Sequence, residues 1–213
     1  MYLTPFSTLS DHDEIIGLVD AVGVAQLVTA GADGMPRASL LPILWDGRER
    51  VIAHVSRANA QFQNLAASTP ALAVVTGPDA YIHPAWYPST ARSWRAVPTW
   101  NYLAVHLGGT LRRHDDPRWL RDAVRALSDH HSPRHQPAWS LDEAPAHYVE
   151  GLLNGIVGVE LTVRRVEAKA KLSGNRVEAD RRRVAEALAG EGTPGATGVA
   201  RQMARRLGPT PGT

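Results

Sequence analysis

The chain has 213 residues and no cysteine; 44% of its residues are hydrophobic and 21% are charged. This length suits one large domain, or one domain with an appendage. The lack of cysteine excludes disulfides, thiolate metal sites and a cysteine nucleophile. No apolar run approaches the roughly 18 residues of a membrane span, and the N-terminus lacks the charged and apolar blocks of a signal peptide. We therefore expect a soluble protein of the bacterial cytoplasm with no membrane partner.

The charges are unevenly distributed along the chain. From Arg164 onward there are 11 basic and 5 acidic residues, whereas the first 163 residues hold 12 basic and 16 acidic ones. A basic C-terminal region can attract phosphate groups or nucleic acid, and it is equally typical of a solvated helix surface. The charge pattern alone leaves both interpretations open.

Strand and helix patterns alternate along the chain. A helix should begin at Asp11, because this residue can cap it and Glu14 follows three residues later. Asp116 followed by Pro117 predicts another helix start, and Gly77–Pro78 predicts a break between two strands. The expected strands are residues 24–30, 35–45, 50–55, 71–75, 81–83, 97–110 and 155–166. Further helices are expected within residues 56–67, 141–153, 176–188 and 199–207.

The connections between the first strands are short. Turn signals at Ala32–Gly34 and Asp46–Gly47 leave no room for a crossover helix, so these strands should be antiparallel. Antiparallel strands with helices inserted at the edges predict an α+β fold around a closed or partly closed six-stranded barrel with peripheral helices. We place the main domain at residues 1–176 and a basic helical extension at 177–213. Four glycines and a proline in Gly190–Gly198 predict a flexible linker within that extension.

Four segments combine polar and aromatic side chains. His54–Gln61 joins a strand to a helix and can cradle a phosphate, although it also reads as a helix cap with a surface arginine. The aromatic residues near positions 81–87 and 97–102 can wall a planar ligand, or they can be core. Lys171–Arg176 can hold an anion or form a strand-to-helix turn. The fourth segment, Arg37–Pro42, lies on a predicted strand.

These segments carry a resemblance to a known family. The matching stretches are Met1–Tyr2 with Phe6, His54–Asn59, Gly77–Ile82, Trp86–Tyr87, Val97–Tyr102, Gly155–Gly158 and Lys171–Arg176. Each is a weak signal alone, but together they occur in order over nearly the whole chain. The chain resembles the PaiB-like family of FMN-binding negative transcriptional regulators. That resemblance implies an FMN-binding split β-barrel that forms a homodimer with flavin at the subunit interface.

The resemblance also implies roles for individual residues. Ser56, Arg57 and Asn59 are expected to hold the FMN phosphate, with Arg37 or Lys171 as a second cation. The backbone from Ser39 to Leu41 would pair with the polar edge of the flavin. The remaining expected cofactor-binding residues are His54, Trp100, Asn101, Lys171, Ser173, Asn175 and Arg176. The last four of these would reach across the dimer into the partner's site.

Two positions depart from the family pattern. Ala60 stands where proline is common, and Gly174 stands where glutamine is usual. Glycine keeps the turn but removes a side-chain amide, so a protein that has kept the fold and lost the flavin is one alternative.

Other functions remain open from the sequence. A regulator would bind DNA or a regulatory protein, but a linker at Gly190–Gly198 is too long for a helix-turn-helix. An FMN-dependent oxidoreductase would use NAD(P)H, because flavin itself carries the redox chemistry. We expect a solvated loop at His130, His131 and His135 rather than a metal site. Haem held by a histidine such as His54, His83 or His106 is a further alternative.

Overall fold

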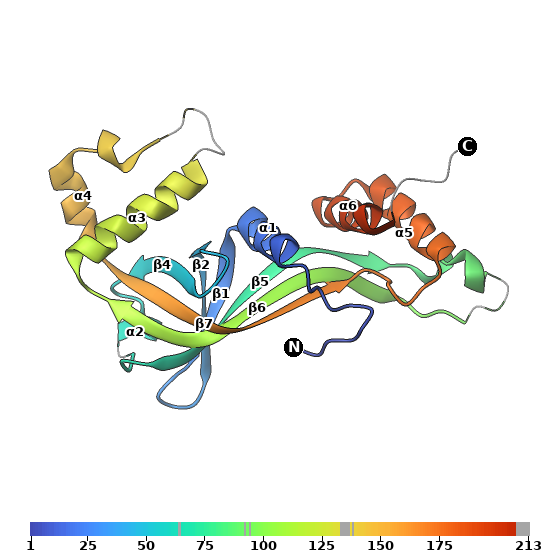
Figure 1. The fold of residues 1–213 in the computed structure, drawn as a ribbon, viewed down its shortest axis with the longest axis horizontal. Helices are drawn as coiled ribbons and strands as arrows, with labels where there is room; N and C mark the ends of the chain where they lie inside the picture. The colour runs from blue at the N-terminus through green and yellow to red at the C-terminus, as the bar shows by residue number, and fades with distance from the viewer. Residues whose placement is uncertain (64, 92, 94, 133–136, 138, 208–213) are drawn as a thin grey trace. The chain divides into compact units, whose positions relative to one another are not determined.

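The computed structural model describes residues 1–63, 65–91, 93, 95–132, 137 and 139–207 (Figure 1). The strands are β1 (Val24–Ala30), β2 (Pro36–Pro42), β3 (Leu44–Trp45), β4 (Arg50–Ser56), β5 (Thr69–Ile82), β6 (Thr99–His114) and β7 (Ile156–Lys171). The helices are α1 (His12–Val22), α2 (Ala60–Gln63), α3 (Pro117–His131), α4 (Ala146–Leu153), α5 (Glu178–Glu191) and α6 (Pro194–Leu207). Short 3₁₀ turns are η1 (Pro84–Trp86), η2 (Pro88–Thr90) and η4 (Leu141–Glu143).

The strands form one sheet in the order β2-β1-β5-β6-β7-β4-β3. β1 pairs antiparallel with β2 and with β5, and β4 pairs antiparallel with β3 and with β7. The predicted α+β class with a mainly antiparallel sheet is confirmed. In the described residues the sheet is open and has seven strands rather than the six of the expected barrel: residues 35–45 split into β2 and β3, and the expected strands 71–75 and 81–83 join in β5. No helix in the described ranges is long and apolar enough to cross a membrane.

The chain divides into two compact units. Unit 1 comprises residues 1–11, 76–105 and 167–213, and unit 2 comprises residues 12–75 and 106–166. The long strands β5, β6 and β7 contribute residues to both units. The expected division at residue 176 stays a prediction.

Unit 2 holds the shorter strands and the helices α1 to α4. β2, at one edge of the sheet order, also contacts β4 and α2, so the sheet curves within this unit. Asp116 caps α3 by accepting a hydrogen bond from the Arg118 amide, as the sequence predicts. A small apolar cluster of Leu120, Leu141, Val149 and Leu153 joins α3, α4 and η4.

Unit 1 contains the C-terminal parts of β5 and β7 and the N-terminal part of β6. The N-terminal segment runs beside β7, where the Leu9 amide donates to the Ala168 carbonyl and the Ala170 amide donates to the Ser7 carbonyl. α5 and α6 pack together through buried residues such as Val184 and Met203. α6 also lies against β5 and β6, since Gly198 approaches Pro78 and the Met203 sulfur contacts the Asn101 amide.

Two sequence expectations about backbone continuity are wrong. β5 runs unbroken through Gly77–Pro78. Its pairing with β1 ends at Val74, so Pro78 lies where β1 no longer requires an amide donor, and proline is tolerated at such an edge. The flexible linker predicted at Gly190–Gly198 is the second. α5 extends to Glu191 and α6 begins at Pro194, so only Gly192 and Thr193 lie between the two helices. Proline suits a first helical position, since its missing amide has no partner there.

Candidate functional site

Unit 1 contains a cleft of about 560 Å³, here called the cationic cleft. It is lined by Tyr2, Thr4, Phe6, Ser7, Tyr87, Val97, Thr99, Asn101, Tyr102, Lys169, Lys171, Leu172, Ser173, Gly174, Asn175 and Arg176. Many of these belong to the stretches that carry the family resemblance. They come from the N-terminal segment, the residue between η1 and η2, the start of β6, and the end of β7 with the loop that follows it. Its volume falls within the range typical of small-molecule sites, which is about 300–1,000 Å³. Segments far apart in the sequence therefore build one cleft.

Three cations line the cationic cleft. The Lys169 ammonium donates to the Tyr2 carbonyl at 2.9 Å, and the Lys171 ammonium donates to the Thr99 hydroxyl and the Trp100 carbonyl. The guanidinium of Arg176 lies 4.4 Å from the centre of the Tyr87 ring. No carboxylate is among the described residues that line the cleft. The cleft is therefore electropositive and suited to an anion.

The two lysines share an aromatic neighbour. The ammonium groups of Lys169 and Lys171 lie 5.6 and 5.9 Å from the centre of the Tyr102 ring. Burial lowers the pKa of Lys171, and the charge of Lys169 lowers it further, while Tyr102 opposes the shift. An anion beside Lys171 would favour its charged form, because an opposite charge reverses that effect.

Ser173 occupies a strained position in the cleft. It is the one non-glycine residue with a positive φ, +58°, in the described part of the chain. The fully buried Asn101 holds it there, since its amide nitrogen donates to the Ser173 hydroxyl at 3.1 Å. The same nitrogen also contacts the Met203 sulfur at 3.6 Å. Strained backbone persists where its surroundings impose it, and such positions concentrate at functional sites.

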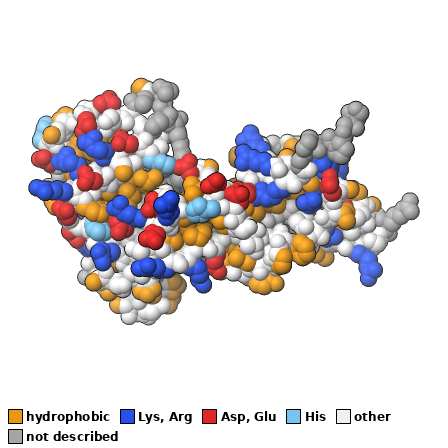
Figure 2. Space-filling view, in the orientation of Figure 1, with side chains coloured by type: hydrophobic (Ala, Val, Ile, Leu, Met, Phe, Trp, Pro, Cys, Tyr) orange, Lys and Arg blue, Asp and Glu red, His pale blue; other side chains and the backbone are white. Residues whose placement is uncertain are grey.

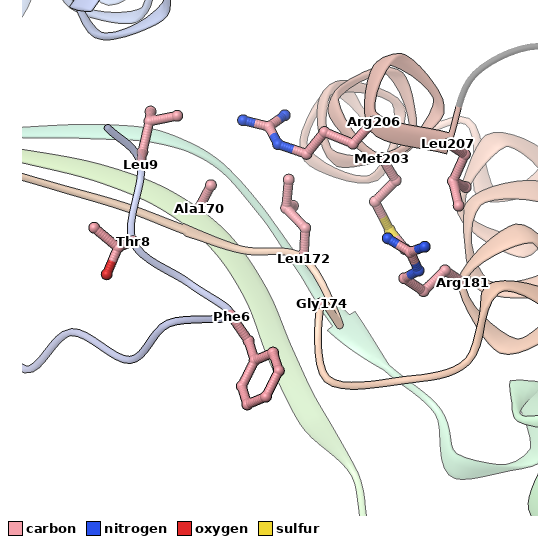
Figure 3. A pocket seen from close by; sticks show the side chains of 10 residues that line it. All are labelled: Phe6, Thr8, Leu9, Ala170, Leu172, Gly174, Arg181, Met203, Arg206 and Leu207. Carbon is pink, nitrogen blue, oxygen red and sulfur yellow. The ribbon is translucent and has the colours of Figure 1, made fainter. Parts of the chain in front are cut away.

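The packing around Gly174 explains why glycine stands here in place of the usual glutamine. A Cβ added there would lie 2.5 Å from the Phe6 carbonyl oxygen, so the N-terminal segment approaches the loop too closely for a side chain. Figure 3 shows the smaller cavity beside this contact, of about 90 Å³, with Arg181 and Arg206 at its helical wall. Phe6, Leu172 and Gly174 line both this cavity and the cationic cleft.

Trp100 does not line the cationic cleft. Its side chain is 53% exposed, and its ring meets Tyr81 edge-on at 6.0 Å between ring centres. Asn101, its neighbour on β6, is completely buried and bonded to Ser173. Asn101 therefore positions the loop, while Trp100 presents an open aromatic surface.

The predicted residues of the other segments lie in unit 2, where hydrogen bonds join β2 to the turn after β4. The Ser39 hydroxyl donates to the Gln61 side-chain oxygen at 2.7 Å and accepts from the Asn59 amide at 3.1 Å. The Gln61 amide nitrogen donates to the carbonyls of Leu27 and Arg37. Sequence reasoning missed Gln61 as the centre of this network, although it stands in the quoted segment His54–Gln61.

Arg57 makes three contacts within unit 2. Its Nε and Nη2 donate to the carbonyls of Asn154 and Ile156, and its Nη1 donates to Asp115 at 2.6 Å. Asp115 also receives two bonds from Arg113, each 2.8 Å long. The positive charge of Arg57 is therefore already paired with the carboxylate of Asp115.

Asp115 provides a test of this network. The two hydrogen bonds from Arg113, followed by the one from Arg57, lower the pKa of Asp115 from 3.8 to about 2. Because the folded-state value is the lower one, the stabilisation is present above pH 3.8 and is lost as the pH falls toward 2. We expect Asp115→Asn to reduce the dependence of the urea midpoint on pH in that window. Asp13→Asn, at an exposed position of α1, is the control; an unchanged pH dependence in Asp115→Asn would contradict the assignment.

The remaining predicted residues of unit 2 have separate surroundings. Arg37 is exposed and lies 3.6 Å from Asp33, and Leu41 is buried in the core. The Ser56 hydroxyl accepts a hydrogen bond from the Ala58 amide. His54 lines an apolar cavity formed with α3 and α4.

Lys169 and Tyr2 are cleft residues that sequence reasoning did not select. The predicted strand ended at Val166, whereas β7 continues to Lys171 and places Lys169 two residues before it on the same face. Continuing the two-residue alternation of the expected strand past Val166 could have revealed Lys169. No sequence signal indicated that Tyr2 would meet it.

The loop expected for His130 and His131 is wrong, because both histidines belong to the last turn of α3. His130 lies 2.6 Å from Asp20, and its ring meets that of His131 edge-on. His135 is outside the described residues. Within those residues there is no group of three histidine or acidic side chains that could hold a metal.

Comparisons with known proteins agree with this fold. Residues 1–165 match the family described as "Putative FMN-binding domain". Over 211 residues the chain is 30% identical to the protease synthase and sporulation protein PAI 2 of Bacillus subtilis (strain 168), covering 97% of this chain and 98% of that protein.

Two solved structures show the same fold at low sequence identity. The conserved hypothetical protein Rv2991 from Mycobacterium tuberculosis gives a TM-score of 0.56 at 16% identity, over 80% of this chain and 91% of that one. The FAD and haem binding protein from Mycobacterium smegmatis gives 0.55 at 19% identity, over 77% and 73%. The described fold is thus similar to the split-barrel fold of these two proteins, although its sheet is not closed. The chain belongs to the PaiB-like FMN-binding family, and FMN is the cofactor of that family.

The cationic cleft fits FMN in its chemistry. A phosphate dianion needs cations and hydrogen-bond donors, which Lys169, Lys171 and Arg176 provide without a carboxylate in the described lining. A flavin ring needs planar or apolar walls, and Tyr87 and Tyr102 can supply them. The residues present are therefore compatible with the cofactor.

Proposed function

We propose that the chain binds FMN through the cationic cleft and acts as a homodimeric, flavin-dependent regulator, with flavin at the subunit interface. The observation that carries the proposal is the convergence of three cations and three tyrosine rings on a cleft with no carboxylate in its described lining. Lys171 and Arg176 would hold the phosphate, and Tyr102 would contact the ring. Bound FMN supplies one- and two-electron redox chemistry.

The protein's own contribution is to hold and shield the cofactor. Asn101 holds the strained Ser173, and the Arg176 amide donates to the Ser173 carbonyl, so the turn that carries Asn175 and Arg176 is formed before the ligand binds. The N-terminal segment is fixed to β7 by Lys169 and by the ion pair between the Met1 amino group and Glu167 at 2.9 Å. This segment contributes Tyr2 and Phe6 to the lining of the cleft.

A regulatory role is supported by the likeness to PAI 2 and by the helices α5 and α6. Because only Gly192 and Thr193 separate these helices, the length of the connection no longer argues against a helix-turn-helix. Arginines on both helices form a basic surface, although Arg182 pairs with Glu178 and Arg183 with Glu186. Sequence-specific DNA binding with a steep salt dependence would support direct regulation.

The first experiment is a titration of the purified protein with FMN and riboflavin, followed by visible absorbance. Saturable binding with at least a tenfold preference for FMN is expected, because riboflavin lacks the phosphate that the cations would hold. Equal affinity would contradict the phosphate assignment, and no binding would contradict the flavin function. Addition of NAD(P)H to the complex then separates the two roles, since rapid bleaching indicates the oxidoreductase and an unchanged spectrum favours the regulator.

A further inference from the structure

The smaller cavity of unit 1, of about 90 Å³, has no role in the flavin proposal. Its volume is well below the roughly 300–1,000 Å³ of typical ligand pockets, so only a small molecule fits. At about 30 Å³ for each water, it holds about three waters, or one molecule of about four to six non-hydrogen atoms.

The walls of this cavity differ in chemistry, as Figure 3 shows. Leu9, Ala170 and Leu172 come from the N-terminal segment and the end of β7, and all three are buried apolar side chains. Arg181 of α5 and Arg206 of α6 lie on the helical wall. No acidic side chain lines the cavity in the described part of the chain. The cavity therefore offers positive charge on one side and apolar surface on the other.

The guanidinium of Arg181 has no hydrogen-bond or ion-pair partner among the described residues. Its Nε atom is completely buried, so a ligand cannot reach it. The terminal nitrogens Nη1 and Nη2 are not among the buried unpaired atoms, so they stay accessible where Arg181 lines the cavity. Arginine is rarely buried without a paired acid, and this unpaired group calls for an explanation. An anion that accepts two parallel hydrogen bonds from Nη1 and Nη2 would supply the missing partner.

The helical wall is electropositive beyond Arg181 as well. Nη1 of Arg206 donates to the Gln202 carbonyl and to the Gln202 side-chain oxygen, at 2.9 and 3.0 Å, and these bonds hold the second guanidinium in place. α6 carries three arginines and no acidic residue. Figure 2 shows basic side chains on the surface of α5 and α6. The combined field of these charges favours a negatively charged ligand.

We propose that this cavity binds a short-chain monocarboxylate. The carboxylate matches Arg181, because its two oxygens can face the two terminal nitrogens, and the alkyl chain matches the apolar wall. Inorganic phosphate is a poorer match, since the oxygens that face the apolar wall would lose water without gaining donors. The proposal does not rest on flavin binding, because Lys169, Lys171 and Arg176 do not line this cavity.

The test uses butyrate as the probe, in a buffer free of phosphate and of other carboxylates. Calorimetric titration of the full chain is expected to show butyrate binding at least tenfold more tightly than butyramide, which has the same shape without the charge. Phosphate should bind at least tenfold more weakly than butyrate. Acetate should bind about tenfold more weakly, because it has two methylene groups fewer to bury.

Substitutions locate the site within unit 1. Arg181→Met is expected to weaken butyrate binding at least tenfold, whereas Arg183→Met, at an exposed position of α5, should not. Without ligand, Arg181→Met should melt at the wild-type temperature or above it, since the removed group has no partner to lose. Butyrate should then raise the melting temperature of the wild-type protein and not that of Arg181→Met. Arg181→Lys keeps the charge, and its butyrate affinity should lie between the other two.

Four results would overturn the proposal. The wild-type protein could bind no butyrate, or it could bind butyramide equally well. Phosphate could bind as tightly as butyrate, which would indicate a general anion site. Arg181→Met could keep the butyrate affinity of the wild-type protein. Lys171→Met could lose that affinity while Arg181→Met keeps it, which would place the carboxylate in the cationic cleft. None of these measurements requires FMN, so failure of this proposal is distinguishable from failure of flavin binding.

Discussion

Gly109→Ala is expected to lower the free energy of unfolding by about 3 kcal/mol, near the upper end of the usual cost of forcing extra atoms into a packed interior. A Cβ at this position of β6 would lie 2.0 Å from the Thr162 carbonyl oxygen and 3.1 Å from the Val163 Cα. These are backbone atoms of β7, and Thr162 also pairs with Arg50 of β4. Backbone atoms cannot move aside by a side-chain rotation, so β7 itself would have to shift to make room for the added methyl group.

Gly108→Ala is the matched control for Gly109→Ala. The nearest atoms to a Cβ at Gly108 lie 3.9 Å away, which is ordinary contact. Loss of glycine's freedom in the unfolded chain should leave this variant as stable as the parent or more stable by up to about 1 kcal/mol. Thermal unfolding should separate the two variants by about 10 °C for a chain of this size. Equal melting temperatures would show that β6 and β7 are not packed this closely.

Lys171→Met is expected to weaken FMN binding by about 10- to 100-fold, the range for losing one charge-assisted hydrogen bond. Riboflavin affinity should change little, because the ring contacts remain. Methionine keeps much of the length and the apolar stem of lysine, so the change removes mainly the charge. Arg183→Met, which lies on α5 outside the cationic cleft, should leave FMN affinity unchanged.

Arg57→Ala distinguishes the two candidate phosphate positions. Arg57 already bonds Asp115 and the carbonyls of Asn154 and Ile156, so we expect its removal to lower stability more than FMN affinity. If Arg57→Ala abolishes the preference for FMN over riboflavin while Lys171→Met keeps it, the phosphate lies at the turn Ser56–Asn59. That outcome would contradict the assignment of the phosphate to the cationic cleft, but it would not contradict flavin binding by the protein.

Several elements could be predicted because their signals are local. The strand Val24–Ala30 and the helix that begins at Pro117 agree with the expected bounds. Short turns and a capping aspartate act over a few residues, so the sequence alone reveals them. The family and its cofactor were likewise predictable, because their motifs are continuous stretches.

Tertiary structure decided how those stretches are used. β5 passes through Gly77–Pro78 since its pairing with β1 ends before the proline, and α6 starts at Pro194 inside a glycine-rich stretch. In both places packing overrides the local breaker signal.

The sequence by itself determined the α+β class, the FMN-binding family and the residue types available for the cofactor. Only the tertiary structure decided that Asn101 is buried against Ser173 and that Arg57 is paired with Asp115. Arg57 and Asp115 are 58 residues apart, and Asn101 and Ser173 are 72 apart. No local pattern encodes such pairs, because their contact depends on which strands the sheet places side by side.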